Sequence, residues 1–330
     1  MKLQVPFIQL PLRFDADRLA AEIAAIGEDA WKPHPQGFPG NSMLPLVAVN
    51  GDPDDEGFAG AMRPTPHLLR CPYLTQVFAS LGAVVGRSRL MRLSGNAEVT
   101  RHADQGYYWA ERVRVHVPIV TQPTVRFECG GQVLHMAAGE CWIFDTWRQH
   151  SVVNDAVRER IHLVVDTVGG SAFWELVAKG RPHAAPIAGW SPRMVAPVEG
   201  ERAAFPCETA NVPAVMSPWE LNTHLALLFN DARPHPNLPV MGQIAGRFAR
   251  AWRGLWAEHG DAESGRAAFR ALLARFLDEI RGPSQGVLLE NELAWFGALN
   301  AMVGRAPRGR QRLSAARGQN FGLSASAVAL

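Results

Sequence analysis

The sequence lacks the features that mark secreted and membrane-spanning proteins. Its four cysteines are scattered and form no Cys-x-x-Cys pair, which predicts reduced thiols in a cytosolic protein. The N-terminal segment has no basic region followed by an apolar run and a small-residue cleavage site. No stretch approaches the roughly 18 continuous apolar residues of a membrane span. We therefore expect a soluble, cytoplasmic protein without a membrane partner.

The chain also lacks a strong net charge, since its formal charge is +2. A nucleic-acid-binding protein is usually more basic, so we expect no nucleic-acid partner, although residues 304–330 form a basic tail that we predict to be flexible. No internal repeat is visible. At 330 residues, of which 47% are hydrophobic, the chain is long enough for one large domain or two of ordinary size.

The first third of the chain mixes helices with a long irregular stretch. We predict an extended segment at 2–13, a helix that Asp15 caps and Gly27 ends, and a second helix between Thr65 and Gly82, broken near Pro72. Residues 31–66 are rich in Pro, Gly, Asn and Asp and read as a loop with one short strand at 45–50. Such a loop is either a functional lid or a surface elaboration, and the sequence leaves both open.

A series of short strands follows, separated by turn residues. Eight strands of this kind predict an antiparallel sandwich or jelly roll. The predicted strands are 84–93, 98–102, 112–120, 124–128, 132–135, 140–145, 150–154 and 160–168.

Two of these strands alternate between charged and apolar residues. Successive side chains of a strand point to opposite faces, so one face carries the polar residues and the other the apolar ones. The polar residues are Arg112, Arg114 and His116 in one strand and Arg158, Arg160 and His162 in the other. A surface sheet with its polar face in water would show this pattern. So would a barrel with a polar site inside, and the neighbouring histidines and aspartate favour the barrel.

Beyond residue 170 the composition changes twice. A Pro-, Gly- and Ala-rich link is followed by helical periodicity from Ser217, which starts a capping box with Glu220. We predict helices at about 218–230, 237–258, 263–282 and 286–303. The domain prediction is a jelly-roll domain with its N-terminal elements at 1–180, a linker at 181–215, a helical domain at 216–303 and the tail at 304–330.

A possible metal site lies within the strand region. His102 and Asp104 are two residues apart, a spacing that places both side chains on one face of a strand. His150 is the best candidate for a third ligand. Two histidines and one carboxylate, with coordination positions left open, form the ligand set of non-haem Fe(II) oxygenases.

The motifs HAD, RVHVPI, GECWIFD, HSVVN and RIHLVVD resemble the aspartyl/asparaginyl β-hydroxylase family of Fe(II)/2-oxoglutarate-dependent dioxygenases. The similarity is closest to its bacterial branch that resembles proline 3-hydroxylase. It is clear over residues 84–168, weaker over 31–83 and only architectural beyond 200. The resemblance implies a double-stranded β-helix, a cupin-like jelly roll, with flanking N-terminal helices and a C-terminal helical region.

The resemblance also implies roles for individual residues. His102, Asp104 and His150 would bind Fe(II), Arg160 would pair with the distal carboxylate of 2-oxoglutarate, and Arg114 and His116 would be further cosubstrate contacts. A guanidinium clamps a carboxylate with two parallel hydrogen bonds, which a lysine copies poorly. Arg158 is an alternative to Arg160, and Arg112 and His162 could support the site or be exposed.

Three aromatic residues follow the HxD motif directly. Tyr107, Tyr108 and Trp109 are candidates for a substrate wall, although a loop that packs against the helices would have the same sequence. Asp145 is interpreted as a residue that orients the His150 turn, and not as a fourth ligand. His34 and His135 are interpreted as ordinary histidines.

The function that the resemblance implies is hydroxylation of an amino-acid C–H bond with Fe(II), 2-oxoglutarate and O2. The substrate could be a free amino acid or an Asp- or Asn-like residue in a peptide or protein. Because Asp104 occupies the carboxylate position, the site has no vacancy for chloride, which favours hydroxylation over halogenation. The alternative is a non-catalytic cupin-like module that binds a metal or ligand as a sensor.

Overall fold

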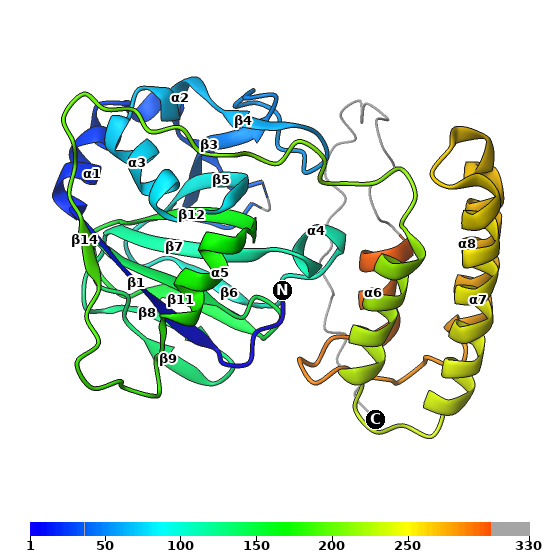
Figure 1. The fold of residues 1–330 in the computed structure, drawn as a ribbon. Coiled ribbons are helices and arrows are strands. Elements are labelled where there is room, and N and C mark those ends of the chain that lie inside the picture. Colours follow the sequence, from blue (N-terminus) through cyan, green and yellow to red (C-terminus); the bar gives the residue numbers. More distant parts are fainter. Residues whose placement is uncertain (36, 305–330) are drawn as a thin grey trace.

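The computed structural model describes residues 1–35 and 37–304 of the chain. The predicted basic tail lies outside the described residues except for Gly304. Figure 1 shows a β-rich body, coloured blue to green, beside a group of long helices coloured yellow to orange. The two parts are joined by an extended segment that runs along the body before the first long helix begins.

Eight consecutive strands form two sheets that pack on each other. One sheet contains the order β10-β7-β12-β5 and the other the order β6-β11-β8-β9. The chain passes back and forth between the sheets, which is the topology of a double-stranded β-helix, so the predicted fold class is confirmed. The strands are β5 (Val84–Leu93), β6 (Glu98–His102), β7 (Val113–Val120), β8 (Val125–Cys129), β9 (Gln132–Leu134), β10 (Glu140–Phe144), β11 (His150–Asn154) and β12 (Arg160–Gly169).

Further strands extend the larger sheet at both ends. An N-terminal strand pairs antiparallel with β10 and carries two short partners, and a strand from the predicted loop pairs antiparallel with β5 and carries two more. These strands are β1 (Phe7–Phe14), β13 (Arg181–Pro182), β14 (Arg193–Val195), β3 (Asn41–Val49), β2 (Lys32–Pro33) and β4 (Met62–Pro64). The strand in the 31–66 segment is thus longer than the predicted 45–50, because Pro45 is accommodated where the pairing of β3 with β5 shifts register.

Helices cover one face of the larger sheet, which we call the outer face. They are α1 (Ala16–Ala24), α2 (Pro66–Leu69), α3 (Pro72–Ser80) and α5 (Ser171–Ala178). Leu19 and Phe78 from these helices share one hydrophobic core with Val115, Leu163 and Val165 of the sheet. The opposite inner face looks toward the smaller sheet. The alternation in β7 and β12 therefore places the apolar side chains under helices and the polar ones between the sheets.

The C-terminal helices form a second hydrophobic core. They are α6 (Pro218–Asn230), α7 (Leu238–His259), α8 (Arg266–Arg281) and α9 (Trp295–Leu299), with a π-helical turn at Asn300–Gly304. Phe248 of α7 stacks on Phe276 of α8 with ring centroids 3.9 Å apart. Ser217 caps α6 by accepting a hydrogen bond from the Glu220 N–H, as its capping-box sequence predicts. The predicted division into domains stays a proposal, which these separate cores support.

The predicted helix at 286–303 is wrong over its first nine residues. Gly286 and Glu292 adopt left-handed backbone conformations, with φ of 78° and 70°. Leu289 forms an isolated bridge to Ala232 after α6, and the Leu289 N–H donates to the Leu293 carbonyl oxygen. These tertiary hydrogen bonds replace helical ones, so the helix starts only at Trp295.

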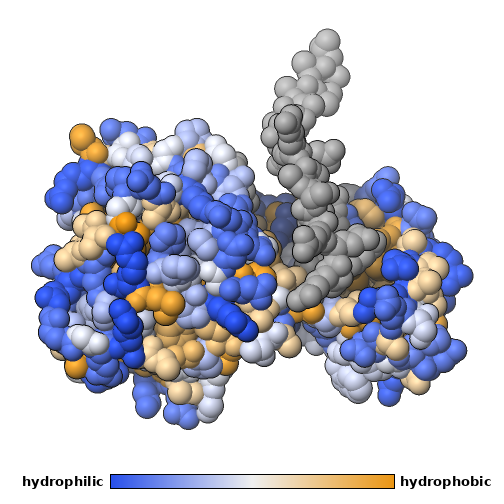
Figure 2. All heavy atoms as spheres, turned by 90° about the horizontal axis from the view of Figure 1, so that it is seen from above, coloured by the Kyte–Doolittle hydropathy of each residue, from blue (hydrophilic) through white to orange (hydrophobic). Residues whose placement is uncertain are grey.

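No helix among the described residues is long and apolar enough to cross a membrane. Figure 2 shows hydrophilic side chains over much of the face seen from above, with hydrophobic ones scattered between them. The four cysteines are free in the structure, and Cys71, Cys129 and Cys141 are buried.

Candidate active site

A cavity of about 340 Å³ lies between the two sheets of the jelly roll. Its lining comes from the inner face of β5, β7 and β12, from the smaller sheet, and from the segment between His34 and Phe58. We call it the inter-sheet cavity. The irregular 31–66 segment therefore contributes directly to a binding space, which agrees with the lid or binding-loop interpretation.

The three predicted metal ligands meet at this cavity. His102 ends β6, and His150 begins β11 directly opposite it in the antiparallel pair. Asp104 follows β6, and its backbone N–H donates to the Thr146 carbonyl oxygen at 2.9 Å, which ties the HxD segment to the turn before His150. One potential donor atom from each of His102, Asp104 and His150 lies within 4.8 Å of the others.

Both imidazoles have the orientation that metal binding requires. The Nδ1 atoms of His102 and His150 lie 2.7 and 2.9 Å from the carbonyl oxygens of Thr100 and Arg148. A neutral histidine that donates from Nδ1 keeps its lone pair on Nε2. Burial lowers the pKa of His150 to about 4, so its ring is neutral at pH 7. Two imidazole nitrogens and a carboxylate fit a divalent iron.

Asp104 is held in its charged form chiefly by the Arg114 guanidinium. Burial raises its pKa, but Arg114 and the two histidines outweigh burial and lower the pKa overall. Arg114 bridges two carboxylates, because its Nη1 lies 3.0 Å from Asp104 Oδ2 and its Nε lies 3.1 Å from Asp166 Oδ1. Its guanidinium also stacks 4.3 Å above the Trp109 ring. The structure thus places Arg114 in the cavity, in contact with the proposed ligand Asp104.

Arg160 differs from Arg114 in having no carboxylate within salt-bridge distance among residues 1–35 and 37–304. Its side chain is buried on the inner face, with Nη2 2.6 Å from His162 Nδ1, and its Nε has no hydrogen-bond partner there. Burial lowers its pKa to about 9. A buried cation without a counter-ion is costly, which makes this position attractive for an anion.

Two histidines complete the surroundings of Arg160. His116 and His162 are both buried, with their Nδ1 atoms 3.4 Å apart, and burial lowers the pKa of each well below 6.5. Arg158, the predicted alternative to Arg160, lies in an exposed bend between β11 and β12. Arg112 forms a buried ion pair with Glu208 and does not line the cavity.

The structure brings one of the three predicted wall residues to the cavity. Trp109 lines it. Tyr107 points to the helical region, where its hydroxyl donates to Glu220 of α6. The Tyr108 hydroxyl accepts a hydrogen bond from the Arg87 N–H at 3.0 Å, and its ring packs against Phe58. We therefore keep the substrate-wall hypothesis for Trp109.

Sequence reasoning missed several residues that line the cavity. Arg87 and Arg89 lie on the inner face of β5. The sequence did contain a signal for these residues. Arg87, Arg89 and Met91 occupy every second position of the strand and so share one face, as the polar residues of β7 and β12 do. His34, interpreted as an ordinary histidine, also lines the cavity, and burial lowers its pKa to about 4.

The turn before His150 is tied to the helical region. Asp145 accepts hydrogen bonds from the Trp147 N–H and from Arg148 Nε, both at 3.0 Å, in line with its predicted orienting role. Trp147 Nε1 donates to Asp231 at the end of α6 at 2.7 Å, and Asn291 Nδ2 donates to the Trp147 carbonyl oxygen at 2.7 Å. Residues far along the chain thus support the loop that carries the third proposed ligand.

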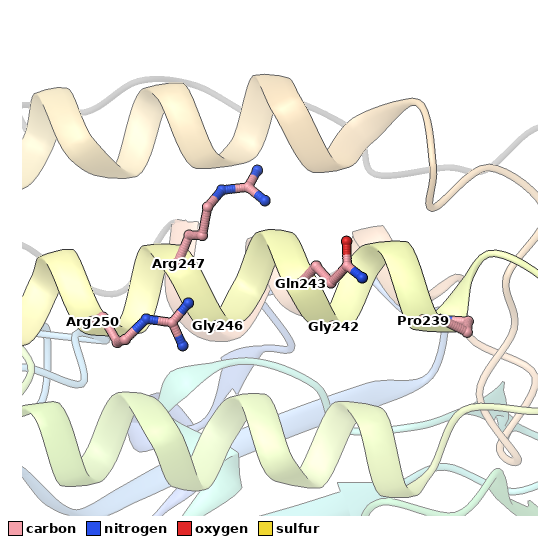
Figure 3. Close-up of a pocket in the computed structure, with 6 residues that line it drawn as sticks. All are labelled: Pro239, Gly242, Gln243, Gly246, Arg247 and Arg250. Carbon is pink, nitrogen blue, oxygen red and sulfur yellow. The ribbon is translucent and has the colours of Figure 1, made fainter.

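A second hollow runs along α7, where Gly242 and Gly246 leave the helix without side chains (Figure 3). Arg247 points from there toward α8 and pairs with Glu279. None of the predicted site residues lines this hollow. The candidate chemistry is therefore concentrated in the inter-sheet cavity.

Comparison with known proteins finds one curated relative and several solved structures that are similar to part of this chain. L-proline cis-3-hydroxylase 1 from a Streptomyces species is 27% identical over 180 residues, which are 50% of this chain and 60% of that protein. A prolyl-4-hydroxylase structure from Pseudomonas putida aligns with 50% of this chain and 92% of its own, at 17% identity and a TM-score of 0.33. HygX from Streptomyces hygroscopicus, with nickel and 2-oxoglutarate bound, aligns with 51% of this chain and 84% of its own, at 10% identity and a TM-score of 0.35.

The match to the curated relative is partial, since this chain spans 60% of that protein's length. The family model for aspartyl/asparaginyl beta-hydroxylase matches residues 57–169. That segment includes His102, Asp104, His150 and Arg160, and it contains all eight strands of the jelly roll. Over residues 57–169 the chain is therefore similar to the aspartyl/asparaginyl β-hydroxylase family.

Proposed function

We propose that this protein is an Fe(II)- and 2-oxoglutarate-dependent dioxygenase that hydroxylates an amino-acid C–H bond. The observation that carries the proposal is the pairing of two features in one cavity. At one place the donor atoms of His102, Asp104 and His150 converge within 4.8 Å. At another, the buried Arg160 has a guanidinium without a carboxylate partner among the described residues. The first suits a divalent metal, and the second suits the far carboxylate of a metal-bound oxo acid.

The protein's own residues would act by holding and orienting the reactants. The Nε2 atoms of the two histidines and the Asp104 carboxylate would bind Fe(II) and leave positions free for 2-oxoglutarate and O2. Arg160 would clamp the distal carboxylate, and His162 fixes Arg160 through the 2.6 Å contact. Bound iron and 2-oxoglutarate supply the O2-dependent oxidation, whereas the protein supplies their position.

Aromatic side chains shield one side of the proposed metal site. The rings of Phe127 and Phe144 lie 6.5 and 4.9 Å from the His150 ring, between centroids. Apolar packing around a metal restricts the access of water and preserves the orientation of its ligands. Arg114 contributes on the other side by holding Asp104 and Trp109. We propose these as positioning roles.

The substrate proposal starts from the curated relative, whose name says that it hydroxylates L-proline. Free amino acids are therefore the first substrates to test, and short peptides with Asp or Asn the second. Turnover is measured as succinate release with Fe(II) and 2-oxoglutarate under air, in the presence of each candidate. We expect at least one candidate to raise succinate release, and we expect His102→Ala to abolish it.

A matched histidine variant controls for general effects of the substitution. His135 directly follows β9, the edge strand opposite β6 in the smaller sheet, and its Nδ1 contacts the Val125 carbonyl oxygen, outside the cavity lining. His135→Ala should keep turnover. Metal and 2-oxoglutarate binding without turnover on any candidate would instead support the non-catalytic, cupin-like alternative. Full activity in His102→Ala would contradict the ligand assignment.

A further inference from the structure

Two guanidiniums on β5 have no role in the proposed metal and cosubstrate site. Arg87 and Arg89 are 8% and 7% exposed, and both line the inter-sheet cavity. Among the described residues, the Arg89 side chain has one hydrogen-bond partner, the Met43 sulfur, 3.4 Å from its Nη1. Arg87 Nη1 donates to the Glu56 carbonyl oxygen at 3.1 Å, and its Nε has no hydrogen-bond partner among the described residues. Neither side chain forms a salt bridge within residues 1–35 and 37–304.

The charges of the cavity do not balance without a further anion. Its lining contains the guanidiniums of Arg87, Arg89, Arg114 and Arg160. The buried carboxylates near them are those of Asp104 and Asp166, and Arg114 contacts both. Glu56 adds an exposed carboxylate to the lining, which makes four guanidiniums against three carboxylates. The positive charge of a divalent metal and the negative charge of doubly charged 2-oxoglutarate cancel each other. Unpaired buried cations are unfavourable, so a second anionic ligand would be stabilised beside β5.

Arg89 and Arg160 lie at different places on the inner face of the sheet. In the pairing of β12 with β5, Arg89 lies opposite Val164, and Arg160 lies opposite Leu93. Four residues along a strand separate two backbone positions by roughly 13 Å. Arg160 is therefore at one end of the inner face with His162, and Arg89 is further along, beside Arg87.

The stacking of Arg87 holds its guanidinium in place before any ligand binds. Its guanidinium carbon lies 3.8 Å from the Phe58 ring centroid and 5.9 Å from that of Trp109. A stacked, planar guanidinium loses little freedom when it accepts a carboxylate. Phe58 comes from the segment before β4, so this arginine is held between the sheet and the segment that closes the cavity.

We propose that Arg89, assisted by Arg87, binds a carboxylate of the substrate, and that the substrate is a small molecule with a free carboxylate. This inference rests on the proposed function and specifies its substrate class. The cavity volume of about 340 Å³ has to hold 2-oxoglutarate as well, which favours a free amino acid or a similar acid over a folded protein segment. Arg89 supplies the charged contact, and Trp109 and Phe58 supply apolar walls.

The experiment measures binding without turnover. The full-length protein is loaded with Ni(II), which replaces iron, and with 2-oxoglutarate. Free L-amino acids, their C-terminal amides and N-acetyl-aspartate amide are then titrated by calorimetry. The variants are Arg89→Met, which removes the charge, and Arg89→Lys, which keeps it. Arg92→Met is the control, since Arg92 lies on the same strand but pairs with Glu28 outside the cavity lining.

We expect at least one free acid to bind the wild-type protein at least about tenfold more tightly than its amide. Arg89→Met should weaken that binding by at least about 30-fold, because one partner of a buried charge pair is lost. Arg89→Lys should restore part of the affinity, and Arg92→Met should leave it unchanged. The affinity of each variant for 2-oxoglutarate should stay within about threefold of wild type.

Several results would overturn the inference. Equal binding of acids and amides would do so, and so would a failure of every acid to bind. A loss of 2-oxoglutarate affinity in Arg89→Met would assign Arg89 to the cosubstrate instead. Tighter binding of N-acetyl-aspartate amide than of every free acid would overturn the small-molecule assignment. If Arg89→Met does not fold, Arg87→Met serves the same comparison. Failure of the wild-type protein to bind 2-oxoglutarate would contradict the proposed function itself.

Discussion

The two faces of strands β7 and β12 are equally buried but differ in chemistry. On the outer face Val115, Leu163 and Val165 are fully covered by helices and belong to the main hydrophobic core. On the inner face Arg160 is 4% exposed and His162 is 1% exposed, yet each has a polar atom without a hydrogen-bond partner among the described residues. Burial alone therefore does not separate structural from functional residues. The inner-face residues Arg160 and His162 are marked by such atoms, although His224, which lies outside the cavity lining, has one too.

The faces also differ in what they contribute to stability. Apolar burial on the outer face favours folding, at about 25 cal/mol per Å² of surface removed from water. Buried charges on the inner face oppose folding unless a partner compensates them. Such a face persists because the rest of the fold holds it in place. A bound anion would offset the unfavourable free energy of its buried charges. The variants below test whether the two faces can be separated experimentally.

The largest effect is expected from Arg160→Met on the inner face. Loss of the guanidinium should lower the affinity for 2-oxoglutarate by about 2–5 kcal/mol, at least about 30-fold, because a buried charge pair loses one partner. The free energy of unfolding without ligand should stay unchanged or rise by up to about 4 kcal/mol, because an uncompensated buried cation is removed. Calorimetric titration and urea unfolding measure the two quantities. A marked loss of stability with unchanged affinity would make Arg160 a structural residue.

The opposite outcome is expected from Leu163→Ala, on the outer face of the same strand. Removing a fully buried leucine side chain should cost about 2–5 kcal/mol of unfolding free energy, through lost burial and the cavity left behind. The affinity of the remaining folded protein for 2-oxoglutarate should match wild type, since the residue does not line the inter-sheet cavity. Urea unfolding and titration below the unfolding midpoint test this. A loss of affinity comparable to that of Arg160→Met would remove the distinction between the faces.

A smaller effect should appear in the pH dependence of stability. Burial holds the pKa of His162 well below 6.5, so the unfolded chain takes up a proton at a higher pH than the folded protein does. The stability contributed by the neutral ring is present above about pH 6.5 and is lost as the pH falls below it, by about 1.4 kcal/mol per pH unit for one histidine.

The His162→Gln variant isolates this contribution. Its unfolding free energy in the absence of ligand should fall less steeply between pH 6.5 and 5 than that of wild type, as measured by urea unfolding at several pH values. Leu163→Ala should keep the wild-type slope. An unchanged slope in His162→Gln would mean that the ring is not held neutral by the fold.

Much of the fold was predictable because period-2 alternation is a local signal. The predicted strands at 84–93, 98–102 and 150–154 coincide with β5, β6 and β11. The polar face of β7 and β12 could be assigned to the interior because His102, Asp104 and His150 surround those strands in the sequence. The same alternation in β5 would have identified Arg87 and Arg89.

Other features depend on contacts that no local pattern contains. Tyr107 follows the HxD motif but contacts Glu220, more than a hundred residues later. The start of the last helix is set by tertiary hydrogen bonds of Leu289 and by left-handed backbone at Gly286 and Glu292. Trp147 meets Asp231 only because α6 packs beside the His150 turn. Such pairings arise from packing between regions, which sequence periodicity does not encode.

The most direct test of the inner face as a metal and cosubstrate site is anaerobic binding of Fe(II) and 2-oxoglutarate, followed by the visible metal-to-ligand charge-transfer band. The wild-type protein should develop the band with one iron and one 2-oxoglutarate per chain, and His102→Ala should not. Absence of the band in the wild-type protein, or an unchanged band in His102→Ala, would contradict the account.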